Sequence, residues 1–316
     1  MPILKSSFKP AWWLPNGHFQ TLWSLFFRIK PKIELNFEKL ELEDNDFLEL
    51  AWTKNDAKNI VLITHGIVGS YDSVYIKGIL KALIKNNLKA VVMNFRGSGN
   101  ETNRLPRSYN AGDSNDLYQT IKFIRKKEPK SNLFLLGYSL GANVLLKLLG
   151  EKNNLPVKAA IAVSPPFDLN KSSLMMARGF SKIYRSYITK RLKDYIKKKN
   201  NLNLDLSRLN KIKTIKEFDD YITAPLNGFR NVEDYYSKTS CNNFIKNIRV
   251  QTLIIHSKDD PLIHPDSIPN EKNLSSKVTL EISQKGGHVG FISGNALFFP
   301  IYWSEKRISE YLSSLL

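Results

Sequence analysis

A serine lies at the centre of the pentapeptide Gly137-Tyr138-Ser139-Leu140-Gly141, which has the form G-x-S-x-G. The apolar run at 133–136 precedes this pentapeptide and predicts a strand buried on both faces. Apolar residues at helical spacing follow it: Ala142, Val144, Leu145, Leu148 and Leu149. A strand, a tight turn and a helix in this order expose a serine hydroxyl as a nucleophile. The alternative is that the G-x-S-x-G pattern occurs here by chance in an ordinary turn. We therefore expect Ser139 to act as a catalytic nucleophile.

A nucleophilic serine needs a proton acceptor and a carboxylate that orients it, and candidates for both occur later in the chain. His288 lies in a glycine-rich loop after a predicted strand at 278–282. Asp260 follows a predicted strand at 252–256, and its neighbour Asp259 is the competing carboxylate. Because each residue follows a strand, all are expected at one edge of a parallel sheet. Weaker acceptor candidates are the remaining histidines, His18, His65, His256 and His264.

Two backbone N–H groups could stabilise a negative charge on the substrate oxygen. Leu140 directly follows the serine at the start of a predicted helix, where N–H groups lack helical partners. Ile67 lies in the loop His65-Gly66-Ile67-Val68-Gly69-Ser70, which follows a buried strand at 60–64. We expect both N–H groups to form an oxyanion hole, although a plain turn is the alternative for the loop.

Strand and helix patterns alternate along most of the chain. Short apolar runs predict buried strands at 60–64, 90–95, 133–136, 159–163, 252–256 and 278–282. Helical spacing is found near 73–86, at 114–127, after Ser139 and at 304–315. An antiparallel pair is predicted within 33–54, with its turn at 43–46. The pattern predicts an α/β fold with a mostly parallel central sheet and helices on both faces.

The chain has 316 residues and a net charge of +18, concentrated in one segment. Residues 171–213 hold thirteen Lys or Arg and two acids, which gives +11. We therefore predict a basic, helical cap at 167–245, inserted into a core formed by 33–166 and 246–316. Because the charge belongs to this insertion, no nucleic-acid partner is expected. Its cations form either a solvated face or a lid that steers an anionic substrate or contacts anionic lipid.

Residues 1–32 are rich in large apolar side chains and are expected to form an arm packed on the core, with an interfacial membrane contact as the alternative. No secretory signal is evident, and the early apolar run at 22–27 is too short to span a bilayer, which favours a cytoplasmic protein. The single cysteine, Cys241, permits no intramolecular disulfide, and no metal-ligand spacing is present. No metal or cofactor is predicted, and a monomer or dimer is expected.

Taken together, these motifs resemble those of the α/β-hydrolase superfamily and, within it, those of the YheT-like hydrolases. The stretches that carry the resemblance cover nearly the whole chain. They are Asn16-Gly17-His18-Phe19-Gln20-Thr21, the loop at 65–70, Asn94-Phe95-Arg96-Gly97 with Asn103-Arg104, the segment from Gly137 to Asn143, Thr223-Ala224-Pro225 with Gly228-Phe229, Asp259-Asp260-Pro261 and Gly286-Gly287-His288-Val289-Gly290-Phe291. Ser98 stands where this family usually has a cysteine. The resemblance implies an α/β-hydrolase fold with Ser139, Asp260 and His288 as charge-relay residues.

The favoured hypothesis is a serine esterase that hydrolyses carboxylic (acyl) esters through an acyl-enzyme. The basic cap and the aromatic arm motivate a more specific alternative, a phospholipase or lipase acting on membrane lipid. An acyltransferase or a haloperoxidase-like reaction with the same three residues is a further alternative, because fold does not fix reaction. A non-enzymatic protein whose cap binds an anionic partner is the remaining hypothesis. Its partner would bind without Ser139.

Overall fold

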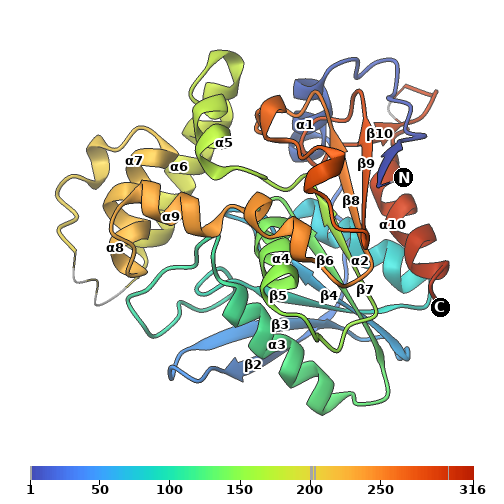
Figure 1. The fold of residues 1–316 in the computed structure, drawn as a ribbon, viewed down its shortest axis with the longest axis horizontal. Coiled ribbons are helices and arrows are strands. Elements are labelled where there is room, and N and C mark those ends of the chain that lie inside the picture. The colour runs from blue at the N-terminus through green and yellow to red at the C-terminus, as the bar shows by residue number, and fades with distance from the viewer. Residues whose placement is uncertain (1, 200–201, 203, 298) are drawn as a thin grey trace.

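One mixed sheet of nine strands crosses the computed structural model, which describes residues 2–199, 202, 204–297 and 299–316 (Figure 1). The predicted segments 1–32, 167–245 and 246–316 include positions 1, 200, 201, 203 and 298, which lie outside the described residues. The strands are β1 (Ile3–Lys5), β2 (Leu35–Glu41), β3 (Phe47–Thr53), β4 (Asn59–Thr64), β5 (Lys89–Asn94), β6 (Asn132–Tyr138), β7 (Ala159–Val163), β8 (Thr252–Ser257) and β9 (Val278–Ser283).

The order across the sheet is β1-β9-β8-β7-β6-β4-β5-β3-β2. All neighbours are parallel from β1 to β5, and β3 pairs antiparallel with β5 and with β2. The predicted mostly parallel sheet is therefore confirmed, including the antiparallel pair. Strands β4 to β8 lie in its middle and are buried on both faces almost throughout, which explains their continuous apolar runs. The short strand β1 places the start of the described chain at the sheet edge.

Helices cover both faces of the sheet, and a separate apolar core fills each face. One core includes side chains from α3 (Ser114–Lys127) and α4 (Leu140–Glu151). The other includes side chains from α2 (Val74–Lys85) and α10 (Trp303–Ser313). Helix α1 (Gly17–Phe26) packs beside α2, and β10 (Ile292–Ser293) pairs with β11 (Ile301–Tyr302). Within the described residues, no helix is long and apolar enough to cross a membrane.

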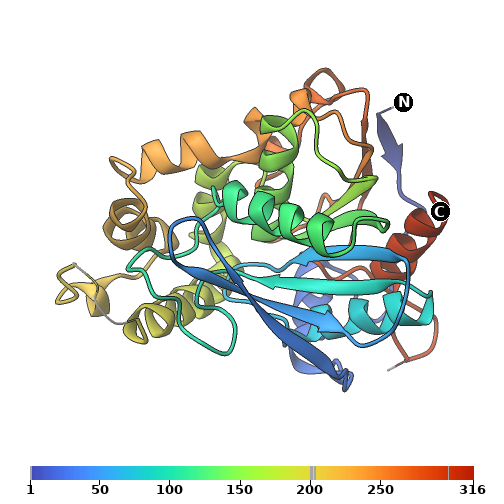
Figure 2. The same ribbon diagram turned by 90° about the horizontal axis from the view of Figure 1, so that it is seen from below.

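Between β7 and β8 the chain forms a group of helices beside one end of the sheet (Figures 1 and 2). They are α5 (Leu169–Met176), α6 (Lys182–Lys197), α7 (Ile215–Phe218), α8 (Ala224–Leu226) and α9 (Val232–Thr239). Helix α6 forms because every fourth residue is apolar. Its buried stripe consists of Tyr184, Ile188, Leu192 and Ile196. Its opposite face is exposed and carries most of its cations.

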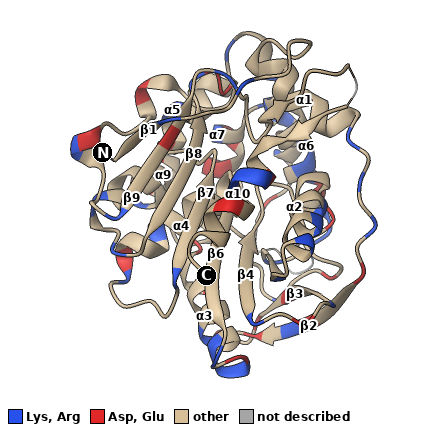
Figure 3. Cartoon of the chain, turned by 90° about the vertical axis from the view of Figure 1, so that its right-hand side faces the viewer, with Lys and Arg blue, Asp and Glu red and all other residues tan. Residues whose placement is uncertain are grey.

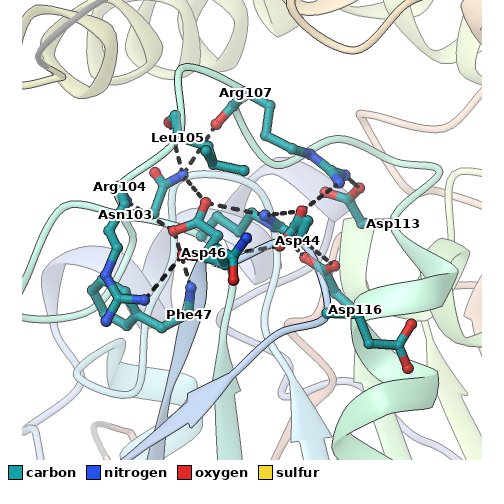
Figure 4. A network of polar contacts seen from close by, with 12 residues as sticks. Asp44, Asp46, Phe47, Asn103, Arg104, Leu105, Arg107, Asp113 and Asp116 are labelled. Atoms are coloured by element: carbon teal, nitrogen blue, oxygen red, sulfur yellow. Dashed lines mark hydrogen bonds and ion pairs between the residues drawn. The ribbon is translucent and has the colours of Figure 1, made fainter.

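A buried ionic network fixes the long loop between β5 and α3 (Figure 4). Arg96 lies at the start of this loop and is 1% exposed. Its guanidinium makes two hydrogen bonds of 2.7 Å to Asp116 on α3 and one of 3.0 Å to Asp46 in the β2–β3 turn. Asp46 also accepts a hydrogen bond from the side-chain amide of Asn103. The network thus ties α3 and the β2–β3 turn to one loop.

The same loop is attached to the end of α6. The Lys199 ammonium donates to the carbonyl oxygens of Leu105 at 3.1 Å and Arg107 at 3.0 Å. The Tyr195 hydroxyl donates to the Arg96 carbonyl at 2.8 Å. Burial lowers the pKa of Lys199 to about 8. These contacts hold the inserted helices over the loop, which continues into a wall of the candidate site.

Candidate active site

Ser139 occupies a sharp turn between β6 and α4, as its motif predicts. Its φ of 51° is a left-handed conformation that side chains rarely adopt. Both glycines of the motif are required by close packing. A Cβ at Gly137 would lie 2.7 Å from the Ala142 Cα, and one at Gly141 would lie 2.5 Å from the Thr64 carbonyl oxygen. The turn therefore depends on the two glycines and presents the serine at the end of the sheet.

The structure brings Ser139, His288 and Asp260 together. The His288 Nε2 atom lies 2.9 Å from the Ser139 Oγ, and its Nδ1 atom lies 2.8 Å from the Asp260 Oδ2. With a proton on Nδ1, the imidazole donates to the carboxylate and accepts the serine hydroxyl. Burial alone would raise the pKa of Asp260. The charge of His288 and the hydrogen bond between the two residues outweigh burial and hold that pKa below its ordinary value. The carboxyl group is therefore ionised at neutral pH.

Asp259, the competing carboxylate, has a different set of contacts. Its Oδ1 atom accepts a hydrogen bond of 2.9 Å from the Gly287 N–H, one residue before the histidine. Burial raises the pKa of Asp259 above its ordinary value. In this arrangement Asp260 contacts the imidazole, and Asp259 contacts the backbone that carries it.

Ile67 and Leu140, the two candidate oxyanion donors, lie in the loop after β4 and at the start of α4. Both residues line the same cavity as Ser139, and neither N–H has a hydrogen-bond partner among the described residues. A Cβ at Gly66 would lie 3.2 Å from the Ser139 Cβ, so the loop approaches the serine closely. The two N–H groups are thus available to a substrate oxygen.

Other groups fix the loop that carries Ile67. The Gly66 N–H donates to the Tyr75 hydroxyl at 2.8 Å, and the Val68 N–H donates to the Tyr109 hydroxyl at 3.0 Å. The His65 Nδ1–H donates to the Gly66 carbonyl at 2.8 Å. Burial lowers the pKa of His65 to about 4, so this histidine is neutral at pH 7. It therefore orients the loop and is not placed for proton transfer at Ser139.

Two apolar cavities meet at the serine. The first extends under the inserted helices and is lined by Met176, Ile188, Leu192, Ile215, Phe218 and Leu262. The second passes between α1 and α6 and is lined by Leu25, Tyr184, Tyr187, Ile188, Leu262 and Val289. Ser139 and His288 line both. An ester with apolar groups on each side of its carbonyl carbon can therefore be accommodated.

Comparison with known families agrees with this architecture. Residues 59–295 match the family model described as alpha/beta hydrolase fold. The chain is an α/β hydrolase. It is 37% identical to the candidate esterase YheT of Escherichia coli (strain K12), over 98% of this chain and 94% of that protein.

A more distant relative of this α/β hydrolase is named a lipase, and a solved structure of similar fold is named an esterase. A monoacylglycerol lipase of Saccharomyces cerevisiae (strain ATCC 204508 / S288c) is 31% identical, over 75% of this chain and 56% of that protein. The esterase Pf2001 of Pyrococcus furiosus superposes with a TM-score of 0.61 at 19% identity, covering 91% of this chain and 98% of that chain. This structural likeness shows the fold alone.

Sequence reasoning missed the part of the α/β hydrolase that holds the histidine loop. Thr21 on α1 accepts a hydrogen bond of 2.8 Å from the His288 N–H and donates one of 2.7 Å to the Gly17 carbonyl. Gln20 bonds to both backbone groups of Ile292, accepting at 2.7 Å and donating at 3.0 Å. The motif at 16–21 is therefore the support of the loop that carries His288.

Close backbone contact explains the glycines at this junction. A Cβ at Gly17 would lie 1.9 Å from the Asp259 carbonyl oxygen, and one at Gly287 would lie 2.4 Å from the Gly17 carbonyl oxygen. The signal in the sequence was a polar motif among aromatic residues. No local pattern could identify its partner, because 267 positions separate Thr21 from His288.

The remaining histidines of the α/β hydrolase lie outside the hydrogen-bonded group. His256 is buried beside Phe167, and burial lowers its pKa to about 4. Within the described chain, neither of its ring nitrogens has a hydrogen-bond partner. The His18 Nδ1 lies 3.1 Å from the Tyr184 hydroxyl and thus joins α1 to α6. None of these contacts reaches Ser139.

Proposed function

We propose that this α/β hydrolase is a serine esterase that cleaves carboxylic esters through an acyl-enzyme. The observation that carries the proposal is the continuous hydrogen-bonded path from Ser139 through His288 to Asp260. Ile67 and Leu140 line the same cavity as Ser139, and their N–H groups have no hydrogen-bond partner among the described residues. Nucleophile, base, orienting carboxylate and oxyanion donors are the set of groups that acyl transfer requires.

The first half of the reaction forms the acyl-enzyme. The Ser139 Oγ attacks the ester carbonyl carbon while the His288 Nε2 takes its proton. The carbonyl oxygen becomes an oxyanion and accepts hydrogen bonds from Leu140 and Ile67, at the positive end of α4. Asp260 stabilises the imidazolium. The imidazolium then protonates the alcohol oxygen as the carbon–oxygen bond breaks, and the alcohol leaves.

The second half returns the enzyme to its starting state. His288 takes a proton from a water molecule, whose oxygen attacks the acyl carbon of the Ser139 ester. The oxyanion again accepts hydrogen bonds from Leu140 and Ile67. When the bond to Ser139 breaks, His288 returns the proton to the serine oxygen, and the carboxylic acid is released.

The cavities support an apolar acyl ester as the substrate. Side chains of α5, α6 and α7 line the first cavity, which suits an acyl chain, and the second suits the alcohol part. The yeast relative is named a monoacylglycerol lipase, and a lipid ester of that kind has apolar groups that suit the apolar linings of the two cavities. A lipid ester is thus a more specific substrate class within the esterase proposal.

Labelling with a fluorophosphonate probe tests the proposal. The wild-type protein is expected to form a covalent adduct, and the Ser139→Ala protein is expected to form none while keeping its circular dichroism spectrum. A chain-length series of p-nitrophenyl esters, measured on the wild type, gives the preferred acyl length. Labelling that persists in Ser139→Ala would assign the reactive nucleophile elsewhere.

Thr21 is expected to act as a positioning residue for His288. Thr21→Val removes the hydroxyl that accepts the His288 N–H and leaves that donor unpaired in a part-buried site. We expect kcat to fall about 10- to 100-fold, because displacements of about 1 Å in a catalytic group have effects of this size. The rate of labelling by the probe should fall in parallel.

Thr21→Ser is the matched control, since a serine hydroxyl can make both hydrogen bonds. Its kcat and labelling rate should return to near the wild-type values. Equal losses in Thr21→Val and Thr21→Ser would show that the methyl group matters and that the hydrogen bond does not. Urea unfolding of both variants separates loss of positioning from loss of fold.

A further inference from the structure

The mouth of the second cavity is rimmed by exposed apolar side chains. Leu25 on α1 and Tyr187 on α6 both line this cavity, yet they are 53% and 51% exposed. The cavity has one wall from α1, which includes Thr21 and Leu25. Another wall comes from α6 and includes Tyr184 and Tyr187. The cavity that contains Ser139 therefore opens between two helices whose outer edges are apolar.

Exposed apolar residues are also found elsewhere on both helices and in the turn at 179–181 that precedes α6. We define the α1–α6 rim as the exposed apolar residues of this region, which are Phe19, Leu25, Phe26, Phe180, Ile183 and Tyr187. Phe26 is 72% exposed. The edge-to-face contact of His18 with Phe180 joins the two sides. Large exposed apolar groups that gather around a pocket mark an interaction site.

The α6 side of the rim is also strongly basic. Helix α6 contains six Lys or Arg and a single acid, Asp194. Ile183, Tyr187 and Lys190 recur at helical spacing, so apolar and cationic side chains share one exposed face. In the described part of the chain, neither Lys182 nor Lys190 has a carboxylate within salt-bridge distance. Figure 3 shows α6, with blue Lys and Arg positions, at the same end of the molecule as α1.

This combination fits the surface of an anionic lipid bilayer. Aromatic and aliphatic groups insert at the level of the headgroups, and lysines beside them attract anionic phosphates. The aliphatic side chains of Leu25 and Ile183 suit acyl chains, whereas stacked nucleic-acid bases would favour aromatic groups throughout. The rim also leads directly into an apolar cavity, which a surface for a protein or nucleic-acid partner does not require.

We propose that the α1–α6 rim binds an anionic lipid surface, so that a lipid ester enters the second cavity directly from the bilayer. The docking step depends only on the rim, and the entry of a substrate rests on the esterase function proposed above. Binding is expected to weaken with added salt, because part of the attraction is electrostatic.

Vesicle flotation of the Ser139→Ala protein tests the docking step without hydrolysis of the lipid. The protein should float with vesicles of phosphatidylcholine and phosphatidylglycerol and much less with phosphatidylcholine alone. In the same background, Phe26→Ser with Ile183→Ser should weaken binding about tenfold or more. Lys182→Gln with Lys190→Gln should weaken it about 10- to 30-fold.

Matched variants far from the rim serve as controls. Phe37→Ser removes an exposed phenylalanine of β2, and Lys126→Gln with Lys130→Gln removes two exposed lysines, one in the last turn of α3 and one just after it. Both controls should float as the parent protein does. Absence of flotation, or equal losses in the rim variants and the controls, would overturn the docking proposal.

Hydrolysis of p-nitrophenyl butyrate by the protein with Ser139 intact distinguishes the two proposals. A protein that hydrolyses this water-soluble ester but does not float contradicts docking alone. A protein that floats but lacks hydrolysis and probe labelling contradicts the esterase function alone, and the rim then remains a lipid-binding surface. Retention of flotation at high salt would contradict the electrostatic part of the proposal.

Discussion

Asp260→Asn is expected to reduce kcat about 10⁴-fold, the size of effect that loss of the orienting carboxylate has in serine hydrolases. The asparagine amide can donate a hydrogen bond to the His288 Nδ1, which favours the tautomer with a proton on Nε2. That tautomer cannot accept the proton of the Ser139 hydroxyl. Stopped-flow or steady-state hydrolysis of a p-nitrophenyl ester measures the loss, and circular dichroism checks the fold.

Asp259→Asn is the control for this variant, because it makes the same chemical change one residue away. Its side-chain oxygen can still accept the Gly287 N–H, so kcat should stay within about tenfold of the wild type. A larger loss in Asp259→Asn than in Asp260→Asn would reverse the assignment of the acid. The pair of variants therefore decides between the two carboxylates that sequence alone left open.

Arg96→Met is expected to destabilise the fold by about 3–5 kcal/mol, because it leaves buried carboxylates without their cation. Asp116 and Asp46 are 1% and 0% exposed, and both hydrogen-bond to the guanidinium. Burial alone would lower the pKa of Arg96, but the hydrogen bond and charge of Asp116 outweigh it and raise that pKa above its ordinary value. The arginine is therefore always charged. The midpoint of urea unfolding measures the change.

Arg104→Met serves as the comparison within the same region. Arg104 pairs with Glu41 at the surface, where its side chain is 48% exposed, and such pairs contribute about 1 kcal/mol or less. Combining Arg96→Met with Asp116→Leu should restore part of the lost stability, because the buried carboxylate that would lack its cation on α3 is then also removed. Equal unfolding midpoints for Arg96→Met and Arg104→Met would refute the central role of this network.

Elements with a strong local signal could be predicted from the sequence. The helix expected at 114–127 is α3, Ser114–Lys127, and the strand expected at 159–163 is β7, Ala159–Val163. The nucleophile turn could be predicted because a local motif between a strand pattern and a helix pattern signals it. The structure shows that contacts with residues nearby in sequence or on the adjacent strand require its two glycines. In each case the signal comes from residues that are close in sequence or from apolar residues that repeat with a fixed period.

Features that depend on distant contacts could not be predicted. Strand β1 has three residues, too few for a periodic pattern, and it exists because it pairs with β9. The choice between Asp259 and Asp260 depends on the backbone of the histidine loop, in which Gly287 has a φ of 61°. The role of Arg96 also required the fold, because its partners lie 50 and 20 positions away.

The support of the histidine loop by α1 has a consequence for the order in which the enzyme matures. During synthesis, Thr21 leaves the ribosome long before its partner His288. Strand β1 likewise cannot pair until β9 has been synthesised. Such long-range pairings form slowly because a large loop must close first. An unfinished chain can thus contain the reactive serine turn but no oriented imidazole. The proposed esterase activity would therefore begin only when α1 has packed against the loop that carries His288.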